Sequence, residues 1–157
     1  MSRRSAYVCG PLPELPSEHQ ITMRILYAAI ADVFKEVAGV RAFVSHEHFD
    51  PVAHANDKSS EIHVAKQDQI CNETYLVVVV AKAPFSGHDI EVEMARQSGI
   101  PAIIVGEREE LRAQEIFRLR HSNPAVVDVI PYDSLDDLRQ KLRAKIRFMF
   151  TFPGAMA

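Results

Sequence analysis

The chain has 157 residues, of which 47% are hydrophobic and 25% charged, and its formal net charge is −3. These values are typical of one ordinary globular domain, residues 1–157, that is long enough to bury a core. The sequence has no dense Lys/Arg run and no apolar run long enough to span a bilayer, which argues against nucleic acid or a membrane as the main partner.

Two features concern the compartment. Cys9 and Cys71 are isolated and lack C-x-x-C spacing, as expected for buried thiols in a reducing environment. The first ten residues, MSRRSAYVCG, lack the apolar stretch of a secretory signal. We therefore expect a cytoplasmic protein.

Apolar runs bounded by turn residues alternate with longer amphipathic stretches along the chain. This alternation predicts an α/β domain, a flavodoxin-like (Rossmann-like) three-layer sandwich with a five-stranded parallel sheet. A loose tail is expected from about 149 to 157. The predicted strands are 6–10, 41–45, 76–81, 101–105 and 125–131, and the predicted helices are about 17–37, 59–73, 87–98, 108–120 and 134–148.

Several helix ends carry recognisable signals. Ser17 is a candidate N-cap and Gly39 a candidate stop for the first long helix, whereas Asp133 or Ser134 could cap the last one. Apolar residues at helical spacing support two of these helices. They are Ile21, Ile25, Ala28, Ala29, Val33 and Val37 in the first, and Ile90, Met94 and Ala95, the expected buried face, in the helix near 87.

The ligand crevice of an open parallel sheet lies outside the carboxyl ends of its strands, where the strand order reverses. In a flavodoxin-like order, the first and third strands flank this point. The loops at 10–12 and 83–88 follow these two strands. We therefore expect both loops to border the site.

Three acids stand at the start of the helix near 87. Asp89 forms a capping box with Ser86, which accounts for it without any catalytic role. Glu91 and Glu93 cannot both lie on one side of the buried face, so one should point toward the crevice. A carboxylate near a helix N-terminus is stabilised as an anion, which suits a nucleophile. Spacing alone leaves open whether Glu91 is catalytic or a solvated helix acid.

Segments 6–12 and 83–105 resemble the nucleoside 2-deoxyribosyltransferase superfamily, which includes nucleoside 5′-monophosphate N-glycosidases. Residues 87–95, GHDIEVEMA, lie over the family's helix start, and 98–101, SGIP, over the turn that follows it. The order and lengths of the predicted elements extend the resemblance from about Ser5 to Arg147.

The resemblance implies a role for three residues. Glu91 takes the place of the glutamate that attacks C1′ of the sugar, and Tyr7 the place of the tyrosine that orients it. Asp68 fits the aspartate that contacts the base or assists protonation of the leaving group. From the residues alone, Tyr7 is as readily a half-buried strand aromatic, and Asp68 a solvated helix acid.

Some positions depart from the family pattern. The transferases carry an acid six residues before the glutamate, where this chain has Phe85, so the resemblance favours a hydrolase. Thr74-Tyr75 stands where an Asp is usual, and Glu93 where a glycine is usual. A transferase and a non-catalytic nucleotide-binding or sensing domain of the same fold therefore stay open.

The remaining expectations concern ligands. The family implies a nucleoside or nucleotide substrate and a homodimer, whereas the base, the sugar and the need for a 5′-phosphate stay open. The expected substrate-binding residues are Gly10, Pro11, Phe49, Ser86, Gly87 and His88.

The His-rich segment 46–57 raises the question of a metal. His46 and His48, two apart on a segment expected to be extended, would point to one side, and Asp50 could complete a ligand set. Against this, no HExxH motif or partner Cys is present and Pro51 breaks the geometry. The chain has six glycines, and their spacing matches neither a P-loop nor a GxGxxG motif, so no motif for ATP or NAD binding is present. We expect no metal and no cofactor.

Overall fold

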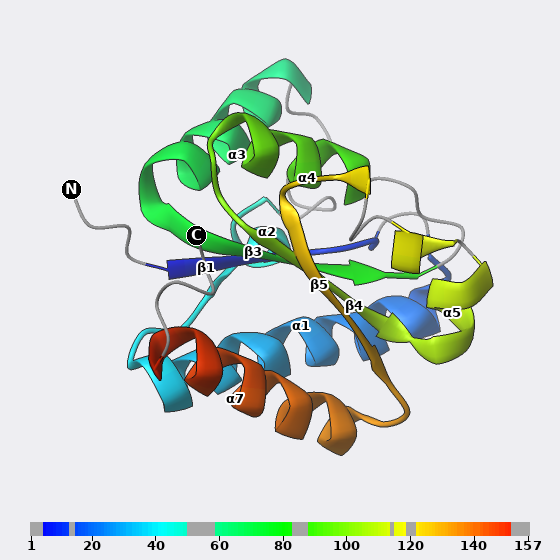
Figure 1. Cartoon of the computed structure of the whole chain (residues 1–157). Coiled ribbons are helices and arrows are strands. Elements are labelled where there is room, and N and C mark those ends of the chain that lie inside the picture. Colours follow the sequence, from blue (N-terminus) through cyan, green and yellow to red (C-terminus); the bar gives the residue numbers. More distant parts are fainter. Residues whose placement is uncertain are drawn as a thin grey trace.

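A computed structural model describes residues 5–12, 15–49, 59–82, 88–113, 115–118 and 122–151. Its centre is a single five-stranded sheet in which all neighbouring strands are parallel (Figure 1). The strand order is β2-β1-β3-β4-β5, so β1 and β3 flank the point where the order reverses. The predicted α/β fold with a five-stranded parallel sheet is confirmed. The strands are β1 (Ser5–Cys9), β2 (Phe43–Val44), β3 (Thr74–Ala81), β4 (Ala102–Glu107) and β5 (Val126–Tyr132).

Helices cover both faces of the sheet, which gives three layers. In Figure 1, α1 and α7 lie below the sheet, and α3 and α4 lie above it. Across the described ranges, no helix combines the length and apolar character needed to cross a membrane. The helices are α1 (Ser17–Ala38), α2 (Ser45–His48), α3 (Ser59–Glu73), α4 (His88–Gln97), α5 (Arg108–Ala113), the short 3-10 helix η1 (Ile116–Arg118) and α7 (Leu135–Thr151).

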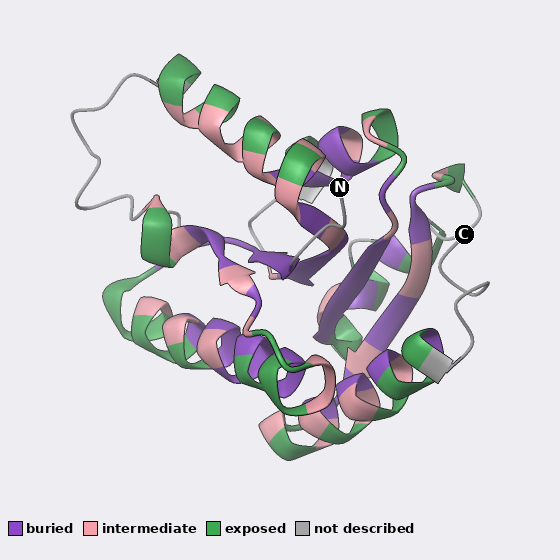
Figure 2. Ribbon diagram, turned by 90° about the vertical axis from the view of Figure 1, so that its left-hand side faces the viewer, coloured by how far each residue is buried: buried purple, intermediate pink, exposed green. Residues whose placement is uncertain are grey.

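The strand alternation divides the core into two clusters. Ala6 and Val8 of β1 pack with residues of α1 and α7, whereas Tyr7 and Cys9 pack with residues of α3 and α4. Successive side chains of a strand point to opposite faces, so Tyr7 and Cys9 must share a face. Figure 2 shows the buried strands between helices whose outer sides are exposed. Tyr7 is therefore placed in the same layer as α3 and α4.

The C-terminal region differs from the prediction in two places. The helix expected over 108–120 is the short α5 followed by η1, because Glu115 adopts a φ of 55°, which an α-helix does not tolerate. The tail expected to be loose from 149 is helical to Thr151, because Met149 is buried against the core. Residues 152–157 lie outside the described part of the chain.

Two of the helix-end predictions are confirmed. Gly39 is left-handed, with a φ of 84°, and its N–H donates to the Lys35 carbonyl. The Oγ of Ser134 accepts from the Asp137 N–H at 3.1 Å, so Ser134 is the cap of α7. Ser17 is not a cap, because α1 already begins at Ser17 and Pro16 precedes it. The capping box expected from Ser86 lies outside the described residues.

The predicted inward face of α1 is correct in its C-terminal half, where Ala29 and Val33 are buried and Val37 packs against the core. It is wrong for Ile21 and Ile25. These two side chains are 63% and 57% exposed. A second stripe of larger side chains at the same spacing faces the sheet, because it buries more apolar area. This stripe contains Met23, Leu26, Tyr27, Ile30, Ala31 and Phe34.

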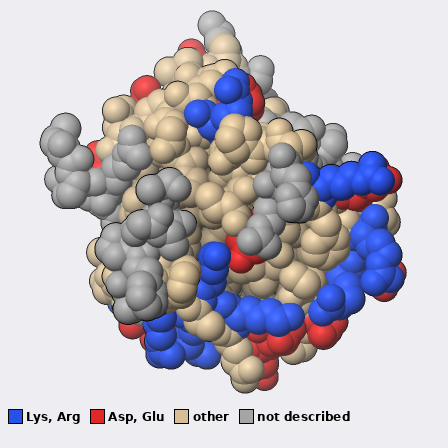
Figure 3. All heavy atoms as spheres, viewed as in Figure 1, with Lys and Arg blue, Asp and Glu red and all other residues tan. Residues whose placement is uncertain are grey.

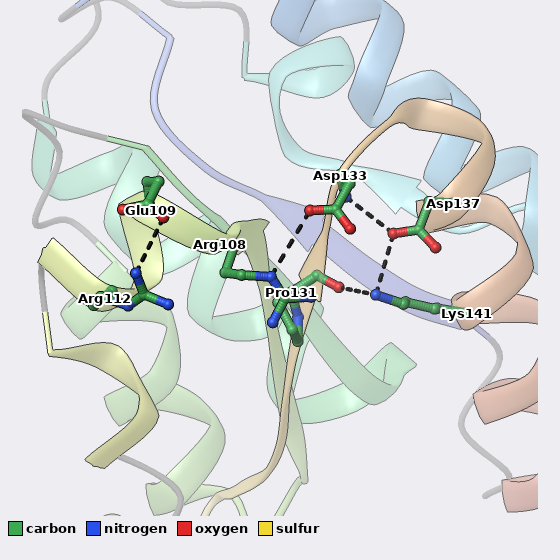
Figure 4. A network of polar contacts seen from close by, with 7 residues as sticks. All are labelled: Arg108, Glu109, Arg112, Pro131, Asp133, Asp137 and Lys141. Carbon is green, nitrogen blue, oxygen red and sulfur yellow. Dashed lines mark hydrogen bonds and ion pairs between the residues drawn. The ribbon is translucent and has the colours of Figure 1, made fainter.

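An ion-pair network lies where β4 and β5 end (Figure 4). The Nζ of Lys141 donates to the Pro131 carbonyl at 2.6 Å and lies 3.1 Å from Asp137 Oδ2, and that same oxygen accepts from the Asp133 N–H. Arg108 Nε lies 3.8 Å from Asp133 Oδ1.

On the face in Figure 3, basic side chains have acidic ones beside them, so this face carries no uniformly basic surface.

Candidate active site

A polar cluster lies within the α3/α4 layer of the core. Glu91, in the first turn of α4, is 6% exposed, and among the described residues it is the one charged side chain that is buried. Its Oε1 lies 3.6 Å from Nζ of Lys66 on α3. Tyr7 and Cys9 of β1 are close enough for the charge of Glu91 to raise the pKa of both side chains. Three elements, far apart in the sequence, thus meet at one carboxylate.

The inward face of α4 explains why Glu91 is buried. Val92, Met94 and Ala95 belong to the core, and Glu91 lies on the same side of the helix. Ile90, expected in the buried face, is 52% exposed, so that part of the prediction is wrong. The inward side of the first turn of α4 therefore carries the Glu91 carboxylate instead of the Ile90 side chain.

Burial raises the pKa of Glu91, and this is the largest influence on it. The Lys66 ammonium opposes the shift most strongly, and a backbone N–H and His63 add to this opposition. Glu91 is therefore a carboxyl group that is largely removed from water but accompanied by one cation. Such a group can ionise and yet is poorly solvated, which suits reaction with an electrophilic carbon.

Tyr7 is fully buried, and its hydroxyl donates to Oγ of Ser45 at 3.1 Å. Burial raises the pKa of this phenol well above 10, so the hydroxyl stays protonated at neutral pH. The structure brings Tyr7 to the face that carries Glu91, but the hydroxyl is directed to Ser45. That Tyr7 orients Glu91 stays a prediction. Ser45 could not be predicted from the sequence, because a lone serine after a two-residue strand carries no recognisable signal.

A cleft of about 580 Å³ lies between α3 and the segment after β2. One wall is aromatic: the ring of Phe43 stacks on Tyr7 with centroids 5.4 Å apart, and on His48 at 4.0 Å. Phe49 and Asp68, two of the predicted site residues, both line this cleft. Its lining is Phe43, His48, Phe49, Ala65, Asp68, Gln69, Asn72 and Glu73.

Asp68 and Lys66 belong to different sides of α3. Two residues along an α-helix are separated by about 200° around its axis. Lys66 faces Glu91, whereas Asp68 faces the cleft. The acid that the resemblance implies and the carboxylate of Glu91 are therefore not neighbours, and the sequence analysis missed Lys66, the residue that does contact Glu91.

The two histidines of the candidate metal segment do not converge. They belong to the four-residue helix α2, so the expectation of an extended segment with both side chains on one side is wrong. Nε2 of His46 lies 2.7 Å from the Gly10 carbonyl oxygen, and the ring of His48 stacks on Phe43. Within the described ranges, no three His, Cys, Asp or Glu side chains could hold a metal together. Asp50 lies outside these ranges.

The loop after β1 is held tightly by its neighbours. The Tyr27 hydroxyl donates to the Pro11 carbonyl, and His46 contacts that of Gly10. Gly10 and Pro11 are buried, and their part in substrate binding stays a prediction. Ser86 and Gly87 lie outside the described residues. His88 begins α4, but its side chain is not described.

Gly10→Ala is expected to destabilise the fold. A Cβ at this position would lie 2.5 Å from the Tyr27 hydroxyl oxygen and 3.0 Å from the Val80 carbonyl oxygen. Overpacking of this kind costs about 1–3 kcal/mol. The free energy of unfolding should fall by this amount, which is measured as a lower midpoint of urea unfolding. Adding Tyr27→Phe, which removes the nearest atom, should recover part of the loss. A midpoint unchanged by Gly10→Ala would show that the loop adjusts freely.

Comparisons with known proteins give a likeness of fold. No protein-family model and no curated protein matches the chain. Among solved structures, the chain is similar to the CMP N-glycosidase BcmB of Clostridium botulinum, with 21% identity, a TM-score of 0.59, and 88% of this chain and 98% of that chain covered.

Two further structures are similar over almost their whole lengths. BlsM gives 17% identity and a TM-score of 0.66, with 99% of this chain and 98% of that chain covered. A conserved protein from Enterococcus faecalis V583 gives 14% identity and a TM-score of 0.58, with 92% and 99% covered. The resemblance noted at residues 6–12 and 83–105 implies a fold shared with nucleotide N-glycosidases, and the similarity to BcmB confirms it at the level of the fold.

Proposed function

We propose that the chain is an N-glycoside hydrolase that cleaves the base–sugar bond of nucleosides or nucleoside 5′-monophosphates. The observation that carries this proposal is the buried carboxylate of Glu91, at the edge of the sheet where β1 and β3 end. Among the residues that the structure describes, the partners of this carboxylate belong to the polar cluster around it. The likeness in fold to a CMP N-glycosidase supports the choice of substrate class.

The proposed chemistry has two steps. Glu91 attacks C1′ as the C1′–N bond breaks, and the base leaves with the bonding electrons and takes up a proton. Water then adds at C1′ of the glycosyl-enzyme, which releases the sugar and returns the carboxylate and a proton. The transition states have oxocarbenium character, so a poorly solvated anion beside C1′ stabilises them.

The described surroundings supply the remaining roles. We assign Tyr7, protonated and bonded to Ser45, to the buried layer beneath the site, where it supports Glu91. We assign the base to the cleft lined by Phe49 and Asp68. Because Asp68 faces away from Lys66 and Glu91, its part in protonating the leaving base stays a prediction. Gly10 and Pro11 border the sugar through their backbone. We also assign a 5′-phosphate to Ser86, Gly87 and His88, as the resemblance implies; Ser86 and Gly87 lie outside the described residues. The enzyme works without a metal or cofactor, as a homodimer in the cytoplasm.

A second candidate is a nucleotide-binding or sensing domain without turnover. The ion pair between Lys66 and Glu91 favours it, because a buried acid that serves only the structure is also held by a cation. In that case the cleft beside Phe43 binds a base, but no bond is broken. A transferase that passes the sugar to a second base differs from the hydrolase only in the acceptor.

Incubation with a panel of nucleosides and nucleoside 5′-monophosphates tests the proposal. Free base should be released from at least one member, as detected by liquid chromatography, and the rate should be the same after exhaustive treatment with EDTA. Loss of activity in EDTA and its return with zinc or manganese would assign a metal enzyme instead. Binding without release from any member would support the sensing domain.

A further inference from the structure

Glu91 is surrounded by groups from two other elements. α3 contributes Lys66 and His63, and β1 contributes Tyr7 and Cys9. Within α4 itself, Glu93 is half exposed and paired with Arg96. Of the described groups around Glu91, Lys66 is the one that forms an ion pair with it, with Nζ 3.6 Å from Oε1.

We propose that Lys66 is the positioning residue of this site: its ammonium holds one oxygen of the buried Glu91 carboxylate and keeps the group ionised, and so available as a nucleophile, near neutral pH. The catalytic part of this inference rests on the proposed function. The pairing of the two residues does not.

The burial of the two partners supports this role. The side chain of Glu91 is 9% exposed and that of Lys66 is 24% exposed, so the carboxylate is shielded from water more fully than its lysine partner. A charge pair in such surroundings is screened less than one on the surface. The Lys66 cation therefore acts on Glu91 strongly, and it does not itself need to be fully desolvated.

The other neighbours cannot replace Lys66. Burial and the charge of Glu91 raise the pKa of both Tyr7 and Cys9, so these groups stay neutral beside the carboxylate. Lys66 lowers the pKa of Cys9 as well as that of Glu91, so its charge acts on a β1 side chain and on an α4 side chain. His63 acts in the same direction as Lys66 but more weakly.

The decisive measurement is the titration of Glu91 itself, which requires no turnover. Protein with carbon-13 at the glutamate side-chain carboxyl is titrated by NMR, and the Glu91 signal is assigned as the one absent from Glu91→Gln. In Lys66→Met the signal should titrate at higher pH than in the wild type, because the favourable charge is gone. In Lys66→Arg it should stay near the wild-type position.

Lys82→Met is the matched control. Lys82 is also partly buried, at 26% exposed, and its Nζ lies 3.7 Å from Glu110 rather than from Glu91. This variant should leave the Glu91 titration unchanged. A Glu91 signal that titrates at the same pH in Lys66→Met as in the wild type would overturn the proposal, and circular dichroism of each variant verifies that it is folded.

The pH profile of base release tests the catalytic consequence. The acid limb of kcat/KM should move to higher pH in Lys66→Met, with a loss on the order of tenfold at the acid end of the profile that shrinks as the pH rises. A merely structural role would lower kcat/KM by the same factor at every pH, and that result would overturn the catalytic part. If the wild type releases no base, the proposed function fails, while the NMR titration still decides whether Lys66 controls Glu91.

Discussion

Glu91→Gln is expected to abolish base release while leaving the fold intact. The amide keeps the shape of the side chain but cannot form the glycosyl ester, so the first chemical step loses its nucleophile. Loss of a covalent nucleophile costs several kcal/mol of barrier, and kcat should fall by about 10³-fold or more. Single-turnover release of free base, followed by chromatography, measures the effect.

Glu93→Gln is the matched control for this experiment. Glu93 lies two residues away on the same helix, is 45% exposed and pairs with Arg96 on the surface, so its replacement should leave kcat nearly unchanged. If Glu91→Gln or Glu91→Ala kept more than about a tenth of the wild-type kcat, the assignment of Glu91 as nucleophile would be wrong.

A 2-fluoro-arabinosyl analogue with a good leaving group is expected to trap the glycosyl-enzyme. Fluorine next to C1′ destabilises the oxocarbenium-like transition states of both steps, and the leaving group restores the rate of the first step only. Intact-protein mass spectrometry should show the added sugar. Peptide mapping should place it on residues 87–96, GHDIEVEMAR, at Glu91 and not at Glu93.

The fate of this adduct separates the alternatives. Release by water supports the hydrolase. Faster release on addition of free base would identify a transferase, despite Phe85 at the position where the transferases carry an acid. No adduct with any leaving group, together with measurable nucleotide binding, would support the sensing domain.

The fold could be predicted from the sequence because its signals are strong and repeated. The all-apolar run of β3 and the alternation of strands with helices specify a parallel sheet covered on both faces. Tyr7 packs in the same core cluster as the inward residues of α4, so both lie on one face of the sheet. Sequence spacing could limit the candidates to Glu91 and Glu93, and the resemblance then selected Glu91, which is the buried one.

The orientation of α3 could not be predicted, and with it the partner of Glu91. Its apolar residues form no clear stripe, and Val64 is 54% exposed, so the spacing does not determine which side faces inward. The sequence therefore could not show whether Asp68 or Lys66 lies on the side of α3 that faces Glu91. α1 presents the opposite problem, because two apolar stripes compete. α2, with four residues, is shorter than the window in which helical periodicity can be detected.

The burial of Glu91 also affects the thermodynamic stability of the fold. Because its pKa in the folded chain is raised above the ordinary 4.5, the folded state binds this proton more tightly than the unfolded chain. The stabilisation from Glu91 is then fully present below the unfolded pKa and is lost as the pH rises through the raised folded pKa. At neutral pH the ionised side chain works against folding, and the rest of the core must offset it. The chain thus carries its proposed nucleophile at the expense of conformational stability, as active sites commonly do.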